Sequence, residues 1–581
     1  MRELAEVAAP SRAATAEWRR CPACEAFVYH KRLRRNLHVC PECNHHFRLV
    51  IRDRVEMLLD EGSYEELSGD LEPLDALSFV DSKPYPERIA AAQKKSGAKS
   101  GALFGTGTIG GRPLVVAGID FGFIGGSMGG AVGESITRAA ELALERRIPL
   151  LVISASGGAR MQEGCVSLMQ MAKTSQAIGR LYEEGILYVS LLTDPTYGGV
   201  SASFATLGDV LVAEPDAHIG FAGPSVIEQT IRQTLPDGFQ TSGFLMDHGM
   251  LDLVETRENL GRALRNLVEF HAHAEEARAA GRDGLASRLP ETEGAAPVDD
   301  PEALSVREPW EVVQLAREIT RPHTLDYVGY VFDDFVELHG DRQFREDPAI
   351  VSGVAQLGEL VVVLIGHQKG STTGEMMERN FGMPEPDGYR KGMRMMRYAA
   401  KFGLPVITLV DTAGAYPGLG AEERGQSNAI AESIMLMSRL PVPCVTVVTG
   451  EGGSGGALAL GAADRVLMLE NSYYSVISPE GCATILFKDA AAAPRAAAAL
   501  RITAPDLLRL GVMDAVVPEP ADGAHTDHNT TAANLKTALV QTLGELLPLS
   551  PDELLEQRYD RFRRFGTPGR QPVLPPIEEK G

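Results

Sequence analysis

The sequence predicts an α/β protein in which two copies of one domain follow a small zinc-binding module. Three observations lead to this fold class. The chain has 581 residues, of which 44% are hydrophobic and 23% charged, as in globular proteins with several domains. Two pairs of cysteines stand near the N-terminus. Further along, two regions about 256 residues apart contain the same series of apolar runs and glycine-rich segments.

The composition excludes several classes of function. The formal net charge is -22, which argues against a chain that binds nucleic acid along its whole length. The most apolar stretch, residues 113–132, contains Asp120 and several glycines, so no transmembrane helix is predicted. The N-terminus mixes acids with bases and has no apolar core of a signal peptide. We therefore expect a cytoplasmic protein without membrane contact.

Residues 1–17 are predicted to be a disordered lead, and residues 18–55 a zinc ribbon. The module has two CxxC pairs separated by fifteen residues, Cys21 with Cys24 and Cys40 with Cys43. This spacing is typical of a tetrahedral four-thiolate zinc site. The metal replaces a hydrophobic core that so short a module cannot build, and the closed shell leaves no position for catalysis. We expect one structural Zn²⁺, with neither His45 nor His46 as a ligand.

The zinc module is basic, unlike the rest of the chain. Residues 18–54 contain nine Lys and Arg against three Asp and Glu. Four thiolates around Zn²⁺ add a net charge of about -2, which leaves the module positive. Three interpretations remain open: a solvated basic face, a lid that steers a phosphate-bearing substrate, and a surface that contacts RNA or DNA.

The two repeated regions are predicted to be α/β domains over residues 56–270 and 306–560. In each, two apolar runs end in glycine-rich segments, at residues 154–160 and 193–203 in the first region and at residues 411–416 and 450–458 in the second. Gly158 and Gly198 are 40 residues apart, and Gly414 and Gly455 are 41 apart. Short buried strands that alternate with Ala-rich helices are expected in both copies.

Two segments lack the pattern of a packed domain. Residues 271–305 are rich in Ala, Glu, Asp and Pro and poor in aliphatic residues, which predicts a linker with some helix. Residues 561–581 are rich in Pro, Gly and charged residues and are predicted to be a disordered tail.

The glycine-rich segments indicate a chemistry. Two turns follow neighbouring strands, and the second opens a helix of small residues, so backbone N–H groups from both turns can converge on one developing negative oxygen. Alternatively, these glycines merely permit tight turns between strands and helices. The chain contains no G-x-S-x-G, no P-loop and no H-E-x-x-H motif. Two oxyanion holes without a protein nucleophile predict a reaction between two bound partners that each form an enolate-like oxygen.

These residues resemble the carboxyltransferase component of bacterial acetyl-CoA carboxylase. Residues 18–270 resemble its β subunit, through the cysteine module, FIGGSMGG (123–130), SASGGARMQE (154–163), LMQMAKT (168–174) and FAGP (221–224). Residues 309–560 resemble its α subunit, through GHQKG (366–370), RNFGMP (379–384), DTAGAYPG (411–418), GEGGSGGA (450–457) and SVISPEGC (475–482). Both subunits therefore stand on one chain.

The resemblance implies two crotonase-like (ClpP/crotonase) domains in tandem and the transfer of a carboxyl group from carboxybiotin to acetyl-CoA, which gives malonyl-CoA for fatty-acid synthesis. The first domain is expected to hold the thioester oxygen through Gly157, Gly158, Gly198 and Gly199. The second is expected to hold the biotin ureido oxygen through Gly414, Ala415, Gly456 and Ala457, with Gly455 also in contact with biotin. Biotin itself is expected to act as the base.

The resemblance also implies partners. The sequence lacks an Ala-Met-Lys-Met-like biotinylation site and a P-loop. A biotin carboxyl carrier protein and an ATP-dependent biotin carboxylase are therefore expected as separate partners, with carboxybiotin supplied in trans. The separate subunits of the family pair as two α with two β, so the fused chain is expected to form a homodimer or a higher oligomer.

The sequence is also compatible with four other functions. A carboxyltransferase for propionyl-CoA or another acyl-CoA, a decarboxylase, a crotonase-type hydratase and an RNA-binding regulator built on the zinc module are the alternatives. A hydratase needs poised carboxylates, and only Glu163 and Glu451 stand near the turns. Weaker candidates for CoA or substrate contacts, each equally explained by a solvated charge or structural ion pair, are Arg160, Lys173, Lys369, Arg390 and Lys391. Three further thiols are expected to be reduced packing residues: Cys165, Cys444 and Cys482.

Overall fold

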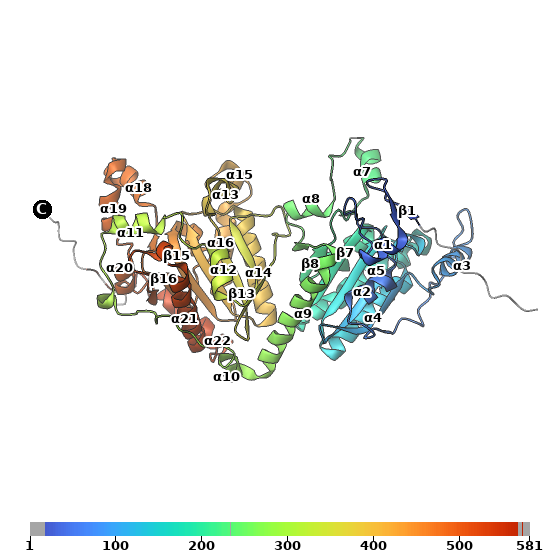
Figure 1. Cartoon of the computed structure of the whole chain (residues 1–581), viewed down its shortest axis with the longest axis horizontal. Helices are drawn as coiled ribbons and strands as arrows, with labels where there is room; N and C mark the ends of the chain where they lie inside the picture. The colour runs from blue at the N-terminus through green and yellow to red at the C-terminus, as the bar shows by residue number, and fades with distance from the viewer. Residues whose placement is uncertain (1–17, 233, 568–571, 573, 575–581) are drawn as a thin grey trace, which may run out of the picture.

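A computed structural model of the chain describes residues 18–232, 234–567, 572 and 574. It contains a small N-terminal module and two α/β domains that lie side by side (Figure 1). The predicted disordered lead, residues 1–17, lies outside the described residues. So does most of the predicted tail, but its first residues belong to helix α22 (Pro551–Arg563), which runs past the expected boundary at residue 560.

The N-terminal module contains few elements. Strands β1 (Trp18–Arg20) and β2 (Phe27–Tyr29) pair antiparallel, and helices α1 (His30–Arg35) and α2 (Ile51–Leu58) follow. Its small core consists of Cys21, Val28, Leu33, Cys40 and Phe47. Two of the five core residues are cysteines, as expected of a module in which a metal replaces apolar packing.

The first domain has an eight-stranded sheet in the order β10-β8-β7-β6-β5-β4-β3, with β9 paired to β7. Its strands are β3 (Glu65–Glu66), β4 (Ala102–Ile109), β5 (Arg112–Ile119), β6 (Leu150–Ser156), β7 (Tyr188–Tyr197), β8 (Val210–Ala213), β9 (Ile219–Gly220) and β10 (Leu253–Val254). Its helices are α3 (Tyr85–Ser96), α4 (Gly130–Arg146), α5 (Gly164–Glu183), α6 (Gly198–Ser201), α7 (Pro224–Ile231), α8 (Ser242–Asp247) and α9 (Arg257–Ala279).

The second domain has the same topology, β11-β12-β13-β14-β15-β16-β18, with β17 paired to β15. Its strands are β11 (Asp334–Glu337), β12 (Ile350–Leu357), β13 (Leu360–His367), β14 (Val406–Thr412), β15 (Cys444–Gly453), β16 (Arg465–Leu469), β17 (Tyr473–Ser475) and β18 (Ala515–Val517). Its remaining helices are α10 (Gly281–Ala286), α11 (Pro309–Ala316), α12 (Thr324–Val331), α13 (Thr373–Glu378), α14 (Pro386–Phe402), α15 (Leu419–Glu423), α16 (Gln426–Ser438), α17 (Ser454–Leu458), α18 (Pro479–Cys482), α19 (Ala493–Leu500), α20 (Ala504–Arg509) and α21 (His528–Leu546).

The two sheets match strand for strand. In each, the first three strands pair antiparallel and the others parallel. The register between the two central strands breaks at the same place, after Ser154 in β6 and after Val410 in β14. The next pairs are Ser156 with Thr196 and, with both numbers raised by 256, Thr412 with Gly452. The internal repeat predicted from the sequence is thus present in the structure.

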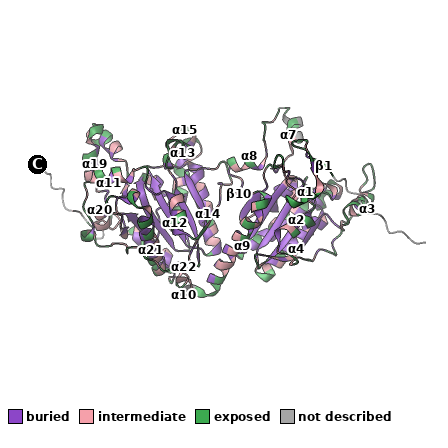
Figure 2. Ribbon diagram, viewed as in Figure 1, coloured by how far each residue is buried: buried purple, intermediate pink, exposed green. Residues whose placement is uncertain are grey.

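Burial explains why the strands of both sheets have apolar sequences. Nearly all residues of the central strands are buried beneath helices, as Figure 2 shows in purple. Parallel strands covered on both faces are expected to be apolar throughout. No helix among the described residues is both long and apolar enough to cross a membrane.

The segment between the domains is more ordered than a linker. Helix α9 runs through the expected boundary at residue 270, and beyond α10 the chain lies along the second domain. Val298 pairs with Val516, and the N–H of Ala295 donates to Asn534 at 2.7 Å. Tertiary contacts that its composition does not reveal therefore hold this segment in place.

Buried ion pairs join the two domains. The ammonium of Lys401 lies 2.6 Å from Asp209, and both side chains are almost fully buried. Asp252 of the first domain accepts contacts from Arg342 and Arg394 of the second. The domains therefore meet through matched charges as well as apolar packing.

Candidate active site

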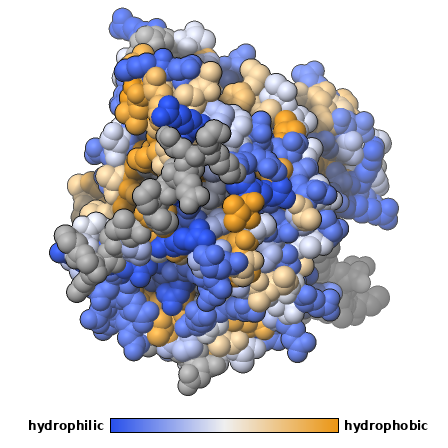
Figure 3. Space-filling view, turned by 90° about the vertical axis from the view of Figure 1, so that its left-hand side faces the viewer, coloured by the Kyte–Doolittle hydropathy of each residue, from blue (hydrophilic) through white to orange (hydrophobic). Residues whose placement is uncertain are grey.

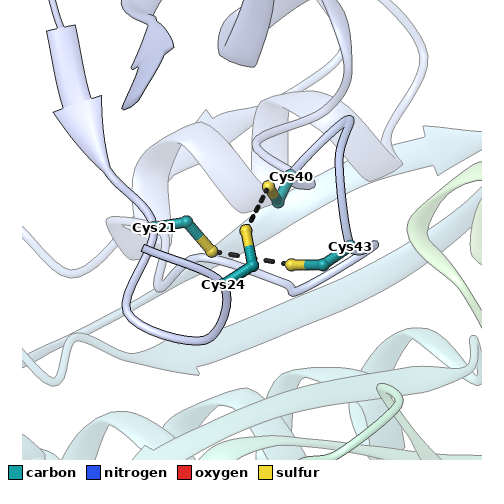
Figure 4. A group of neighbouring side chains, drawn as sticks. All are labelled: Cys21, Cys24, Cys40 and Cys43. Atoms are coloured by element: carbon teal, nitrogen blue, oxygen red, sulfur yellow. Dashed lines mark hydrogen bonds between the residues drawn. The ribbon is translucent and has the colours of Figure 1, made fainter. Parts of the chain in front are cut away.

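The four cysteines of the N-terminal module converge on one point (Figure 4). The sulfur of Cys21 lies 3.7 Å from that of Cys43, and the sulfur of Cys24 lies 3.8 Å from that of Cys40. Thiolates about 2.3 Å from a tetrahedral Zn²⁺ are separated by about 3.8 Å, so the cage fits this ion. All seven cysteines are free of disulfides. The geometry matches the predicted ligand set.

The zinc module is fixed to the first domain by buried charges. The guanidinium of Arg257 donates to the carbonyl oxygens of Leu37, His38 and Phe47 in the module, at 2.7 to 3.1 Å. The same group lies 2.7 Å from Glu214, which also pairs with Arg54. These charges are buried and mutually paired, so they define one orientation of the module against the end of β8.

A second contact joins the module to the end of β7. The guanidinium of Arg48 donates two hydrogen bonds to Asp194, at 3.0 and 3.1 Å. Arg48 also stacks over Phe121, with 4.4 Å between the guanidinium carbon and the ring centroid. Asp194 stands just before the segment that leads into α6, so the module contacts the strand end that carries a predicted oxyanion turn.

The first pair of glycine-rich turns lies in close backbone contact. A Cβ added to Gly198 would lie 2.9 Å from the Cα of Gly158, so only glycine permits this approach. Gly158 and Gly198 both have positive φ angles, of 118° and 63°. The ends of β6 and β7 therefore bring these two turns into contact. The sequence predicts that the two turns lie together, because they follow neighbouring strands.

The hydrogen bonds of the first pair of turns narrow the choice of donors. The N–H of Gly157 donates to Gly125, that of Gly158 to the hydroxyl of Ser156, and that of Gly198 to Phe221. Gly199 stands in the first turn of α6, where a helical N–H has no acceptor within the helix. Among the four predicted residues, Gly199 therefore offers the N–H best placed for a ligand.

Ala159 is a donor that the sequence analysis missed. Met128 donates to Gly158 and accepts from Arg160, so the N–H of Ala159, between them, faces the other side of the chain. That N–H lies 3.8 Å from the position of a Cβ on Gly198. Raising its number by 256 gives Ala415, which was predicted in the second domain. The repeat offset was therefore the signal that could have found it.

The second pair of turns is equivalent but not identical. Gly198 corresponds to Ser454 rather than to Gly455, and Ser454 also has a positive φ, of 56°. Gly455 and Gly456 occupy the first turn of α17. A Cβ on Gly456 would lie 2.3 Å from the nitrogen of Ala415 and 2.9 Å from the hydroxyl of Tyr389. Helix α17 thus packs directly on the first turn.

The five weaker candidates all make ion pairs. Arg160 is buried, donates to Tyr85 at 3.1 Å and lies 3.7 Å from Glu163. Lys173 pairs with Glu134 on the surface. The three candidates of the second domain pair with acidic neighbours: Lys369 with Asp411 and Glu451, Arg390 with Asp387, and Lys391 with Glu346. Arg160 therefore supports the loop before α5 rather than facing solvent.

The three thiols outside the module differ from one another. Cys444 and Cys482 are buried, as expected of packing residues. Cys165 is exposed, so its interpretation as a packing residue is wrong. It stands in the first turn of α5, on a helix face that the domain core does not cover.

A basic pocket lies beside the first pair of turns. It has a volume of about 590 Å³, and three basic residues against one acidic residue line it, Lys83, Arg88 and Lys95 with Glu87, together with Gly125. Arg88 also pairs with Asp81. Gly125 is the residue whose carbonyl accepts the N–H of Gly157. A cationic pocket next to an oxyanion turn suits a substrate that carries phosphate groups some distance from its reacting carbonyl.

Family models and solved structures define the class of protein. Residues 18–43 match the acetyl-CoA carboxylase zinc finger domain, and residues 266–566 match the acetyl co-enzyme A carboxylase carboxyltransferase-like family. A solved structure of transcarboxylase 12S, a hexamer, has a TM-score of 0.65 and 22% identity, covering 92% of each chain. The fold is thus that of the crotonase-like carboxyltransferases, with a four-cysteine zinc ribbon.

Curated relatives are similar over nearly the whole length. The fused β/α carboxyltransferase of acetyl-CoA carboxylase from Saccharopolyspora erythraea is 58% identical, over 95% of each chain. That from Natranaerobius thermophilus is 45% identical, over 94% of this chain and 91% of its own. The α subunit from Thermus thermophilus is 60% identical over 45% of this chain and 82% of its own. The chain belongs to the carboxyltransferases of acetyl-CoA carboxylase, with β-like and α-like halves fused.

Proposed function

We propose that the chain transfers the carboxyl group of carboxybiotin to acetyl-CoA and so forms malonyl-CoA. The observation that carries this proposal is the pair of equivalent turn sites, one in each domain, in which a glycine-rich turn packs against the first turn of a short helix. Each site suits one of two reactants whose carbonyl oxygen gains negative charge. The two half-reactions then need no nucleophilic side chain.

In this proposal the first domain binds the acyl-CoA. Gly157, Gly158, Gly198 and Gly199 form the predicted site, and the free N–H groups of Ala159 and Gly199 are its donors to the thioester oxygen. The basic pocket around Lys83 and Lys95 supports the assignment, because coenzyme A carries phosphates.

The second domain binds carboxybiotin. Gly414, Ala415, Gly456 and Ala457 form the predicted site for the ureido oxygen, with Gly455 beside them. In the transfer step the bond between the ureido nitrogen and the carboxyl carbon breaks and releases CO₂. The ureido group, which now carries negative charge, takes a proton from the methyl group of acetyl-CoA, and the resulting enolate carbon bonds to CO₂ to give malonyl-CoA. The residues of the chain then bind and orient the reactants while biotin itself is the base.

Two partner proteins are required, because this chain is proposed to use carboxybiotin but not to form or carry it. A biotin carboxyl carrier protein brings carboxybiotin, and a biotin carboxylase forms it from ATP and bicarbonate. We further propose a cytoplasmic homodimer or higher oligomer. Exposed hydrophobic side chains on the helices that follow the turns support an assembly, at Met161, Leu168 and Met169 in the first domain and at Leu419 and Met435 in the second.

The reverse reaction tests the function. Purified protein is given malonyl-CoA, with and without biocytin as carboxyl acceptor, and the loss of malonyl-CoA is followed. Biocytin-dependent loss is expected, and methylmalonyl-CoA in its place measures the preference for a propionyl-derived substrate. Equal loss with and without biocytin would instead identify a decarboxylase, and no loss from zinc-loaded, folded protein would contradict the proposal.

RNA binding by the zinc module is a second candidate. Arg34 and Arg35 are exposed at the end of α1, and neither makes one of the contacts described above that fix the module. Binding of RNA that weakens with salt and disappears in the Arg34→Glu, Arg35→Glu double variant would support this function. Absence of binding at low salt would exclude it.

A further inference from the structure

A buried cluster of charges lies at the carboxyl ends of the central strands of the second domain. The ammonium of Lys369 lies 2.7 Å from a carboxylate oxygen of Asp411 and 2.7 Å from one of Glu451. The side chains are 14%, 7% and 7% exposed. One cation therefore bridges β14, which contains Asp411, and β15, which contains Glu451, from a position just after β13.

Both carboxylates stand directly before the glycine-rich turns. Asp411 precedes Thr412, whose hydroxyl accepts the N–H of Gly414 at 3.1 Å and donates to its carbonyl oxygen at 2.8 Å. Asp411 also accepts the N–H of Glu451 at 2.9 Å. Two residues further along β15, a Cβ on Gly453 would lie 2.1 Å from the carbonyl oxygen of Ala413. The separation of the two strand ends thus sets the separation of the turns.

The cluster is charged and fully paired. Burial lowers the pKa of Lys369, but Asp411 and Glu451 outweigh it and raise the pKa above its usual value. Burial raises the pKa of each carboxyl group, and the neighbouring cations more than reverse this, so both pKa values lie below their usual values. The second oxygen of Glu451 accepts from Arg317 at 2.7 Å and from the hydroxyl of Tyr473.

The fold itself does not require this cluster. By strand register, the positions of Lys369, Asp411 and Glu451 in the first domain are held by Phe121, Ala155 and Pro195. None of these three residues carries a charge, yet the first pair of turns is also in backbone contact. The cluster is therefore a feature of the second site and not of the shared architecture.

We propose that Lys369 is a positioning residue for the biotin-side site: its ammonium, shared by Asp411 and Glu451, holds the two turns at the separation that biotin needs. The inference rests on the proposed function for the assignment of biotin to the second domain. Lys369 acts through the strand ends and does not touch the reactants. Arg317 remains bound to Glu451, and His323 lies 3.5 Å from Asp411. Loss of the ammonium nevertheless removes the cation that joins the two carboxylates, so the two strand ends lose their direct link.

Steady-state kinetics of the full chain test the proposal. In the reverse reaction of malonyl-CoA with biocytin, Lys369→Met is expected to lower kcat/KM for biocytin about 100-fold, the effect of an ångström-scale misplacement of a site. The KM for malonyl-CoA is expected to stay within about twofold, because its site lies in the other domain. An unchanged kcat/KM for biocytin, or an equal effect on both substrates, would overturn the proposal.

A matched control separates positioning from stability. Arg558→Met breaks another buried pair of the second domain, in which Arg558 lies 2.7 Å from Asp464. Asp464 accepts the N–H of Cys444, where β15 begins, so this pair stands at the other end of the strand. The variant is expected to unfold at a lower temperature and to keep both kinetic constants. Selective loss of biocytin turnover in Arg558→Met would contradict a role specific to Lys369.

Two further measurements keep the test decisive. If Lys369→Met does not fold, Glu451→Gln preserves the shape of the cluster and is expected to show a smaller loss that is again limited to biocytin. Hydrogen exchange is independent of activity. Lys369→Met is expected to speed exchange at residues 412–416 and 452–457 and not at 157–160. Unchanged exchange at the second pair of turns would refute the positioning role of Lys369, whether or not the chain turns over biocytin. A wild-type chain that turns over no biocytin would instead refute the proposed function.

Discussion

The two domains share one topology but support their glycine-rich turns in different ways. In the first domain the end of β7 is held from outside, by Arg48 of the zinc module bound to Asp194. In the second domain the equivalent strand end is held from inside, by Lys369 between Asp411 and Glu451. The difference shows that the backbone geometry of the turns is the shared requirement, and that the charges around it are free to differ.

The two supports differ in how they respond to the environment. The support of the first domain depends on a metal ion and on surface-accessible Arg48, which is 54% exposed. The support of the second domain is enclosed and involves no metal ligand. Agents that act on the zinc module are therefore expected to affect the first site and to spare the second.

Removal of zinc is expected to have the largest effect. Structural zinc contributes on the order of 10 kcal/mol to the folding of small zinc modules, so a chelator is expected to unfold residues 18–50. Asp194 then loses Arg48, and Arg257 loses the carbonyl oxygens of the module that accept its hydrogen bonds. Limited proteolysis is expected to cleave within the module and to leave the second domain intact, whereas a metal-free module that resists proteases would show that zinc is dispensable for its structure.

The second-largest effect is expected from the buried charges between the zinc module and the first domain. Glu214→Gln leaves Arg54 and Arg257 buried without a counter-charge and is expected to reduce the free energy of unfolding by about 3–5 kcal/mol. Urea denaturation at pH 7 measures this effect. Arg48→Gln, which breaks an exposed pair, is the matched control and is expected to cost about 1 kcal/mol or less.

The effect of Glu214 is expected to depend on pH. Burial raises its pKa, but Arg54, His46 and Arg257 outweigh burial and hold the pKa well below its usual value of 4.5. A carboxylate of this kind stabilises the fold in full above pH 4.5 and loses this contribution as the pH falls through its lowered folded-state pKa. The gap between wild type and Glu214→Gln should therefore narrow in acid. A constant gap down to the acid limit of folding would argue against an ionised Glu214.

A substitution at Gly456, in the second pair of turns, tests the assignment of biotin to the second domain. Gly456→Val places a side chain 2.3 Å from the nitrogen of Ala415, so the turns must separate. Loss of one oxyanion donor typically lowers a rate about 10²–10³-fold, or about 3–4 kcal/mol, and a loss of this size is expected for biocytin turnover. Gly392→Ala is a suitable control, because its added Cβ meets no atom closer than 3.6 Å. Full transfer activity in a folded Gly456→Val protein would contradict the biotin-side assignment.

The basic pocket of the first domain is expected to give the smallest effect. Lys95→Glu reverses one charge at its rim and is expected to raise the KM for malonyl-CoA about fivefold, since an exposed charge contributes about 1 kcal/mol. The effect should fade in high salt. Lys94, its neighbour on α3, does not line the pocket, and an equal effect of Lys94→Glu would mean that overall charge, rather than the pocket, attracts the substrate.

Short-range patterns allowed much of the architecture to be predicted. The CxxC spacing gave the four ligands, because each pair of thiolates is set by one tight turn. The repeat was visible because buried strands and glycine-rich turns constrain residue type at fixed spacing. Ala159 was not predicted, although the repeat offset relates it to Ala415, because the direction of its N–H is set by an isolated bridge between Ala159 and Met128, which lies well before it in the sequence.

The sequence by itself determined the fold class, the zinc ligands and the two pairs of turns, because each follows from short motifs that recur at fixed spacing along the chain. Only the tertiary structure decided that residues 271–305 pack along the second domain, that Cys165 is exposed, and that Lys369 bridges two strands. These outcomes depend on contacts between segments far apart in the sequence. The energy of such contacts comes from burial and charge pairing, which no local pattern of residues encodes.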